Sequence, residues 1–326
     1  MEKIIQKLKN RRLAVGAAVV ILLIIGSFWL FGNGEKPPKT VSEPIGDTEP
    51  TNGSAQPARR TEGEAPAPEP DSQVEPAISP KRVKGITFID AVIEPLQSEL
   101  DRFWGWRPND LIQFTDNVNH YQLGVIEATR RTSIVLAERI SRTGSSDPYV
   151  RELEQAMSMF AIDPTTWMFP RAEAKYQEGL DNIRIYRGML LRNGARFYNR
   201  MDNLVPLILT YESILGSVTE NLLRRDISFF KSDDIFFYSK GVSAMILSAM
   251  EGVGVDFQDT IEAALSTGVY EEIIFSLRQI VAMNPPVILD GGPNSIWANH
   301  RANIAGPMSR VRFLMHILYG ALTGDL

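Results

Sequence analysis

An uncharged apolar run near the N-terminus constrains this chain more than any other feature. Nineteen residues without a charge extend from Leu13 to Phe31. At about 1.5 Å per residue, a helix of that length measures roughly 28 Å, which matches the hydrocarbon core of a bilayer. The sequence therefore predicts one transmembrane helix at 13–31, which holds the protein in a lipid bilayer.

The charges on the two sides of this run differ. Segments rich in Lys and Arg stay on the cytoplasmic side of a membrane. We therefore expect residues 1–12 to form a basic cytoplasmic N-terminus and the C-terminal part to lie outside the cytoplasm. The basic residues before the run are Lys3, Lys7, Lys9, Arg11 and Arg12, whereas only Lys36 and Lys39 follow closely after it.

Two other interpretations concern the same run. A cleaved signal peptide has an apolar core of about 7–15 residues and small residues at its cleavage site. This run is longer and leads into Gly32-Asn33-Gly34, so we favour an anchor that stays in place. Ala14 and Ala18 have the spacing at which two membrane helices can pack, but the spacing is common. A homodimer is therefore compatible with the sequence without being indicated by it.

Residues 32–80 have the composition of a disordered linker. They contain ten of the twenty prolines, no aromatic residue, and nine acidic residues against four basic ones. Such a segment cannot bury enough apolar surface to offset the entropy of ordering. We expect an acidic, proline-rich linker with an r.m.s. span of about 40 Å, which lets the following domain act away from the bilayer.

Helical periodicity begins after residue 80 and continues to the C-terminus. Apolar residues recur at spacings of three and four, and no stretch shows the alternation of a strand. We therefore expect 81–326 to be one all-α domain on the extracytoplasmic side, an antiparallel bundle of roughly eight helices. The longest apolar stripe consists of Leu204, Leu207, Ile208, Tyr211, Leu215, Val218 and Leu222.

Composition and missing motifs exclude several classes of function. The net charge of −5 argues against a nucleic-acid-binding protein, which needs a basic face. A chain without cysteine forms no disulfide, iron–sulfur cluster or cysteine zinc site. The three histidines lack partners at metal-ligand spacing, and Gly252-Val253-Gly254 lacks the preceding strand and third glycine of a dinucleotide-binding loop. We expect no metal, no cofactor and no nucleic-acid partner.

Two tryptophans flank a glycine at the start of WGWRPND, residues 104–110. If they are exposed, Trp104 and Trp106 can stack on a sugar ring or hold a protein partner, with Arg107 and Asp110 as polar neighbours. If they are buried, they close the end of the bundle while Pro-Asn-Asp begins the next helix. We retain these four residues as binding candidates, with packing as the alternative.

Two further segments supply candidates. The run AIDPTTWMFP, residues 161–170, places Trp167 between two prolines, either on a binding surface or in a packed corner between helices. His300 and Arg301 follow a long loop with Asp290-Gly291-Gly292-Pro293, where a small polar site competes with an ordinary turn. No catalytic residue can be assigned. The candidate binding surface is Trp104, Trp106, Arg107, Asp110, Trp167, His300 and Arg301.

Several of these runs together resemble a known family. WGWRPND at 104–110, FAIDP at 160–164, MFP at 168–170, and then Glu173 and Tyr176 resemble the bacterial family labelled domain of unknown function 2333. The resemblance extends over most of Ile86 to Leu326 and includes the N-terminal anchor. It implies a single-pass protein of the bacterial inner membrane in a Gram-negative envelope, with its C-terminal domain in the periplasm. It supplies no catalytic residue.

Two functional hypotheses follow. The first is a non-enzymatic envelope component, a membrane-anchored periplasmic domain that binds a protein of the envelope or organises a complex. An anchor, a long linker and the lack of a catalytic motif favour it. The second is an enzyme or binding module for a cell-wall or carbohydrate substrate, suggested by Trp104, Trp106 and the many carboxylates. The sequence leaves enzymatic activity open and favours the first hypothesis.

Overall fold

The computed structural model describes residues 83–110, 116–144, 147–224, 227, 231–292 and 295–325. The expected cytoplasmic N-terminus 1–12, transmembrane helix 13–31 and linker 32–80 lie outside the described residues, so they stay predictions. The chain divides into two units after Gln73, and every described residue belongs to the second unit.

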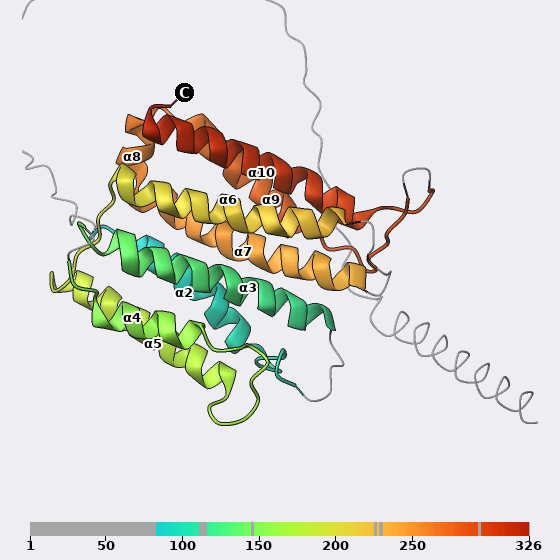
Figure 1. Ribbon diagram of the computed structural model, residues 1–326, viewed down its shortest axis with the longest axis horizontal. Helices are drawn as coiled ribbons and strands as arrows, with labels where there is room; N and C mark the ends of the chain where they lie inside the picture. Colours follow the sequence, from blue (N-terminus) through green and yellow to red (C-terminus); the bar gives the residue numbers. More distant parts are fainter. Residues whose placement is uncertain are drawn as a thin grey trace, which may run out of the picture. The chain divides into compact units, whose positions relative to one another are not determined.

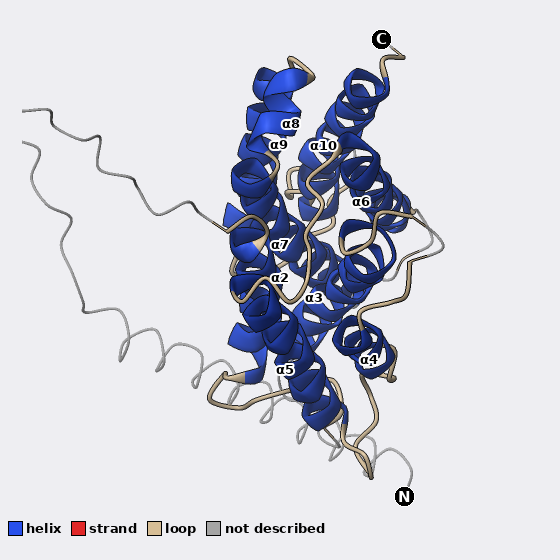
Figure 2. Cartoon of the chain, turned by 90° about the vertical axis from the view of Figure 1, so that its left-hand side faces the viewer, coloured by secondary structure: helices blue, strands red, loops and turns tan. Residues whose placement is uncertain are grey.

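The described part of the chain consists of helices joined by loops (Figures 1 and 2), which confirms the all-α prediction. It contains nine α-helices and no strand, apart from one isolated bridge between Asp290 and Asn299. None of these helices is long and apolar enough to cross a membrane. The α-helices are α2 (Ile86–Leu100), α3 (Asp116–Val135), α4 (Arg151–Phe160), α5 (Ala172–Leu191), α6 (Met201–Leu223), α7 (Ser232–Asp256), α8 (Gln258–Ala263), α9 (Thr267–Ala282) and α10 (His300–Thr323), and a π-helical turn, η1 (Leu136–Ile140), continues α3.

The longer helices form pairs that stack on one another. The pair α4–α5 packs on α2–α3, which packs on α6–α7, and α9–α10 covers the other side of α6–α7 (Figures 1 and 2). The stripe predicted on α6 is the surface that this stacking buries, because each of its seven residues is at most 3 % exposed. Burial of such apolar surface is the main driving force for the fold.

Helix α7 lies at the centre of the stack and packs against α2, α3, α6, α9 and α10. Glycines allow its closest contacts. A Cβ atom on Gly241 would overlap the backbone oxygen of Tyr121 in α3, and one on Gly124 of α3 would overlap the backbone oxygen of Tyr238. A Cβ on Gly252 would lie 2.7 Å from the Cα atom of Phe88 in α2. These helices therefore meet backbone to backbone.

The direction of α3 corrects the expectation of an antiparallel bundle. His120 and Thr132 of α3 contact Asp234 and Met245 of α7 respectively, so residue numbers rise together along the two helices. The α3–α7 pair is therefore parallel. The periodicity of a sequence indicates which face of a helix is buried but not which end of its neighbour it meets.

Other neighbours of α7 run antiparallel to it. The carboxylate of Asp256, in the last turn of α7, accepts a hydrogen bond from Phe88 N in the first turn of α2 at 2.7 Å. Further along, Ser248 Oγ donates to Ala91 O at 2.7 Å. Asp256 is only 1 % exposed, so α7 supplies a buried cap for one of the N–H groups that a helix N-terminus leaves without a partner. The start of α2 is thus fixed at the C-terminal end of α7.

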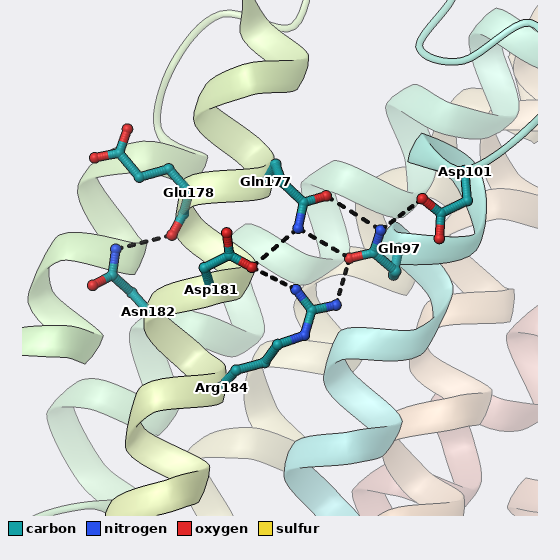
Figure 3. Close-up of polar contacts among 7 residues, drawn as sticks. All are labelled: Gln97, Asp101, Gln177, Glu178, Asp181, Asn182 and Arg184. Carbon is teal, nitrogen blue, oxygen red and sulfur yellow. Dashed lines mark hydrogen bonds and ion pairs between the residues drawn. The ribbon is translucent and has the colours of Figure 1, made fainter.

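A polar network joins α2 to α5 (Figure 3). Gln97 of α2 exchanges hydrogen bonds with Gln177 and accepts one from Arg184 Nη2 at 2.5 Å, and Arg184 also pairs with Asp181 at 2.7 Å. The charged members are largely exposed, and exposed ion pairs contribute only about 0–1 kcal/mol. This network therefore sets the register between the two helices more than it stabilises the fold.

We predict that Gly241→Ala lowers the free energy of unfolding by about 3 kcal/mol, because the new methyl group meets backbone that cannot move aside like a side chain. Gly188→Ala in α5 is the matched control. Its Cβ would have only the guanidinium of Arg192, at 3.4 Å, as its nearest neighbour, so a gain of about 0.5–1 kcal/mol is expected. Urea unfolding followed by circular dichroism measures both; equal effects would contradict the backbone contact.

Candidate binding surface

The loop from Asp101 to Asp110 is held against α3 by one buried side chain. Gln122, which is fully buried, accepts a hydrogen bond from Arg107 N at 2.8 Å. Its Nε2 donates to Gly105 O at 3.1 Å and to Glu99 O at 3.3 Å. Gly105 has a φ of +64°, a conformation that glycine adopts without strain. The backbone of the loop that carries the two tryptophans is therefore fixed in place.

Trp106 points into the molecule. Its side chain is 5 % exposed, its Nε1 donates to Pro164 O at 2.9 Å, and its ring meets that of Tyr176 edge to face at 5.1 Å. Tyr176 Oη in turn donates to Ile162 O at 2.7 Å, and burial raises the pKa of this tyrosine. Trp106 thus closes the end of the bundle, which is the packing alternative considered for it from the sequence.

Asn109 ties the same loop to the segment 161–171. Its Nδ2 donates to Glu173 Oε2 at 2.7 Å and to Thr166 O at 3.2 Å. Glu173 also pairs with Arg171 at 2.5 Å. The runs WGWRPND and AIDPTTWMFP lie about 57 residues apart in the sequence. They therefore form one structural unit where α2 ends and α5 begins.

Both loops of this unit expose large apolar side chains. We define the aromatic end surface as Phe103, Trp104, Trp167, Met168 and Phe169. Trp104 is 72 % exposed, in contrast to Trp106, and Phe103 and Phe169 are more than 90 % exposed. The Arg107 guanidinium lies 5.8 Å from the centre of the Trp104 ring and pairs with Asp110 at 2.9 Å. Side chains of this size are usually buried, so their exposure needs an explanation.

Sequence reasoning missed three members of this surface. Phe103, Met168 and Phe169 were not candidates, although each lies within two residues of a candidate tryptophan in the sequence. The sequence feature that could have identified them is the clustering of large apolar residues within loops. Loop residues with such side chains either pack inward, as Trp106 does, or form part of a contact surface.

His300 and Arg301 serve a different part of the fold. Arg301 is 7 % exposed and donates to Leu222 O and Arg224 O, both at 3.0 Å, at the C-terminal end of α6. It also pairs with Asp290 at 2.6 Å. His300 Nδ1 accepts a hydrogen bond from Leu289 N at 2.9 Å. These two candidates therefore fasten the α9–α10 loop to α6, and they lie apart from the aromatic end surface.

The described residues offer no grouping of three or more His, Asp or Glu side chains that could hold a metal ion. The residues around the aromatic end surface are held by hydrogen bonds and ring contacts, and their exposed part is apolar. This arrangement is suited to binding another surface by contact.

The fold and this surface define an all-helical domain with exposed apolar side chains on two loops at one end. A family model described as "Uncharacterized protein conserved in bacteria (DUF2333)" matches residues 5–226 and 223–316, which together cover nearly the whole chain. The chain belongs to this family, as the resemblance of its motifs predicted. Neither the search of curated proteins nor that of solved structures found a match.

The two tryptophans of the WGW run should respond very differently to truncation. We predict that Trp106→Ala lowers the free energy of unfolding by about 3–5 kcal/mol, because it leaves a cavity beside Tyr176 and removes the bond to Pro164. Trp104→Ala is the matched control and should change it by about 0.5 kcal/mol or less. Urea unfolding of both variants is the measurement; similar losses would show that Trp104 also packs in the core.

Proposed function

We propose that this chain is a protein of the bacterial inner membrane whose helical domain lies in the periplasm and binds a protein partner through the aromatic end surface. The observation that carries the proposal is the exposure of five large apolar side chains on two loops that are bonded to each other. The partner is a protein of the envelope that presents an apolar groove.

The rigidity of the two loops favours binding. Gln122 holds the backbone on both sides of Trp104, at Glu99 and at Gly105, and Asn109 holds Thr166 next to Trp167. A surface that is already ordered loses less entropy when it binds. Tryptophan is also among the residue types that most often contribute the binding energy of an interface. Trp104 and Trp167 are therefore the expected anchor residues.

The aromatic end surface lies far along α2 from the residue at which the described chain enters the domain. The described chain enters the domain at Val83, just before α2, whose first turn is capped by the C-terminal end of α7. The loop with Phe103 and Trp104 follows the other end of α2, one helix of 15 residues or about 22 Å further on. The aromatic end surface and Val83, where the described chain begins, therefore lie at opposite ends of α2.

The membrane location rests on the sequence and on the family. The uncharged run 13–31 has the length of a bilayer, and five basic residues precede it. The match to the bacterial family begins at residue 5 and therefore includes this run. A linker of about 40 Å would let the domain reach a partner some distance from the bilayer.

The alternative of a carbohydrate substrate receives less support. It was suggested by two tryptophans that could stack on a sugar ring. The Trp106 ring, however, already packs against Tyr176 and donates a hydrogen bond to Pro164 O. One exposed indole remains in the WGW run. A contact surface for a protein makes use of Trp104 together with Phe103 and Phe169, and we therefore favour it.

The topology has a direct test. A reporter enzyme that works only outside the cytoplasm should be active when fused after Leu326, because the basic residues before the run 13–31 retain the N-terminus in the cytoplasm. A reporter that works only in the cytoplasm should be inactive at the same position. The opposite pair of results would overturn the proposed location.

The contact surface is tested by crosslinking in cells. We expect a photoreactive amino acid at position 104 or 169 to yield an adduct with the same protein. With the photoreactive residue at 169, the double variant Trp104→Ser and Trp167→Ser should reduce this adduct at least about tenfold, because both expected anchors are lost. The adduct is measured by immunoblotting and identified by mass spectrometry.

Phe313 of α10 provides the matched control, since it is an exposed aromatic residue on a different helix. A photoreactive residue at 313 should not yield the adduct, and Phe313→Ser should not reduce the adduct formed from 169. Two results would contradict a protein partner at this surface. One is that both loop positions give adducts with lipid alone, and the other is that position 313 captures the same protein.

A further inference from the structure

A cavity of about 380 Å³ is lined in part by Arg102, the residue before Phe103 of the aromatic end surface. Four parts of the chain line it: Arg102 after α2, the first turns of α3, the first half of α7, and the end of α9 with Asn284 shortly after it. Its size falls within the range of pockets that bind small molecules. The lining residues are Arg102, Asn117, Val118, Tyr121, Phe237, Lys240, Val281 and Asn284.

Lys240 is the most unusual residue of this lining. It is the one charged residue of α7 between Asp234 and Glu251, and its side chain is half-buried. Its Nζ donates to Asn284 Oδ1 at 3.3 Å, and it forms no ion pair within the described part of the chain. Burial lowers the pKa of this ammonium group. An ammonium group that has lost part of its hydration is stabilised by a partner of opposite sign, so this half-buried position favours an anion.

The other polar groups of the lining can donate hydrogen bonds to an anion. Arg102 is held by Glu99, with a contact of 2.9 Å from Nη2 to Oε1, and its guanidinium lies 5.9 Å from the centre of the Tyr121 ring. Two of its five N–H groups face Glu99, which leaves donors for a ligand. Asn117 belongs to the first turn of α3, where helix N–H groups carry a partial positive charge.

The remaining lining is apolar. Val118, Phe237 and Val281 contribute aliphatic and aromatic surface, and Tyr121 adds a half-buried ring whose pKa is raised to about 12, chiefly by burial. A ligand that fills this cavity would therefore bring a charged group to Lys240 and an apolar body to the helices. A bare inorganic ion would leave the apolar part of the cavity unused.

We propose that this cavity binds an organic phosphate, whose phosphate group contacts Lys240 and Arg102 and whose apolar body lies against Phe237 and Val281. Both a soluble phosphate monoester and the headgroup region of an anionic phospholipid offer this chemistry. The proposal does not depend on the protein partner of the aromatic end surface. Its structural rival is that Lys240 only complements the C-terminal end of α9, where carbonyl groups carry partial negative charge.

The first experiment uses the full-length protein and phenyl phosphate as the soluble probe, measured by isothermal titration calorimetry. Lys240→Gln should weaken binding about tenfold, which corresponds to the loss of one charge-assisted hydrogen bond. Lys84→Gln is the matched control, because it removes the same charge from an exposed lysine that pairs with Asp259 at 2.8 Å. It should change the affinity less than about twofold.

The second experiment uses the wild-type protein, so that it does not depend on the folding of a variant. A water-soluble acetylating reagent is applied, and the acetylation of Lys240 relative to Lys84 is followed by mass spectrometry. Phenyl phosphate should protect Lys240 if the source is soluble. Vesicles of phosphatidylglycerol, but not of phosphatidylcholine, should protect it if the source is a lipid. Either pattern supports the site and identifies the source.

Two results would overturn the proposal. The first is that neither phenyl phosphate nor either kind of vesicle lowers the acetylation of Lys240. The contact with the end of α9 would then be the remaining role of Lys240. Equal weakening by Lys240→Gln and Lys84→Gln would indicate general charge attraction and no defined site. A failed crosslink from position 104 or 169 would leave both measurements unaffected, so the two proposals can fail separately.

Discussion

The backbone contact between α3 and α7 is the constraint on which the rest of the described structure depends. Gly124 and Gly241 let these helices approach until the backbone of each meets the other, with Tyr121 and Tyr238 supplying the facing carbonyl groups. Such close contact gains many dispersion interactions and tolerates no added volume. Because α7 also contacts α2, α6, α9 and α10, the position of most helices follows from where it lies.

The parallel direction of this pair determines what lies at each end of the domain. Both α3 and α7 begin at the same end, and the antiparallel neighbours α2 and α9 finish there. Four chain segments therefore meet around one cavity, and the loop after α2 carries the exposed aromatic side chains next to it. An all-antiparallel arrangement of α3 and α7 would place Asn117 and Lys240 far apart.

The sequence predicted those features that depend on one helix at a time. The all-α class and the buried stripe of α6 follow from apolar spacing, and the structure confirms both. The direction of α3 against α7 depends on contacts over more than a hundred residues, for which periodicity holds no signal. The glycines at 252 and 254 show the same limit. They matched no ligand-binding motif, and their role is to admit Phe88 and the Tyr270 ring to the surface of α7.

The residue types of the candidate surface could be predicted from the sequence, but not which of the side chains point outward. Trp104 and Trp106 both adjoin Gly105 in the sequence, yet one is exposed and the other buried. The difference arises because the chain returns with Pro164 and Tyr176 to receive the Trp106 indole, and because Gly105 turns the backbone between the two rings. The family motifs thus have a physical meaning: Trp106, Asn109, Pro164, Glu173 and Tyr176 bind one another. Since these residues are occupied in holding the loops, the recognition that we propose falls to the side chains that the loops leave exposed.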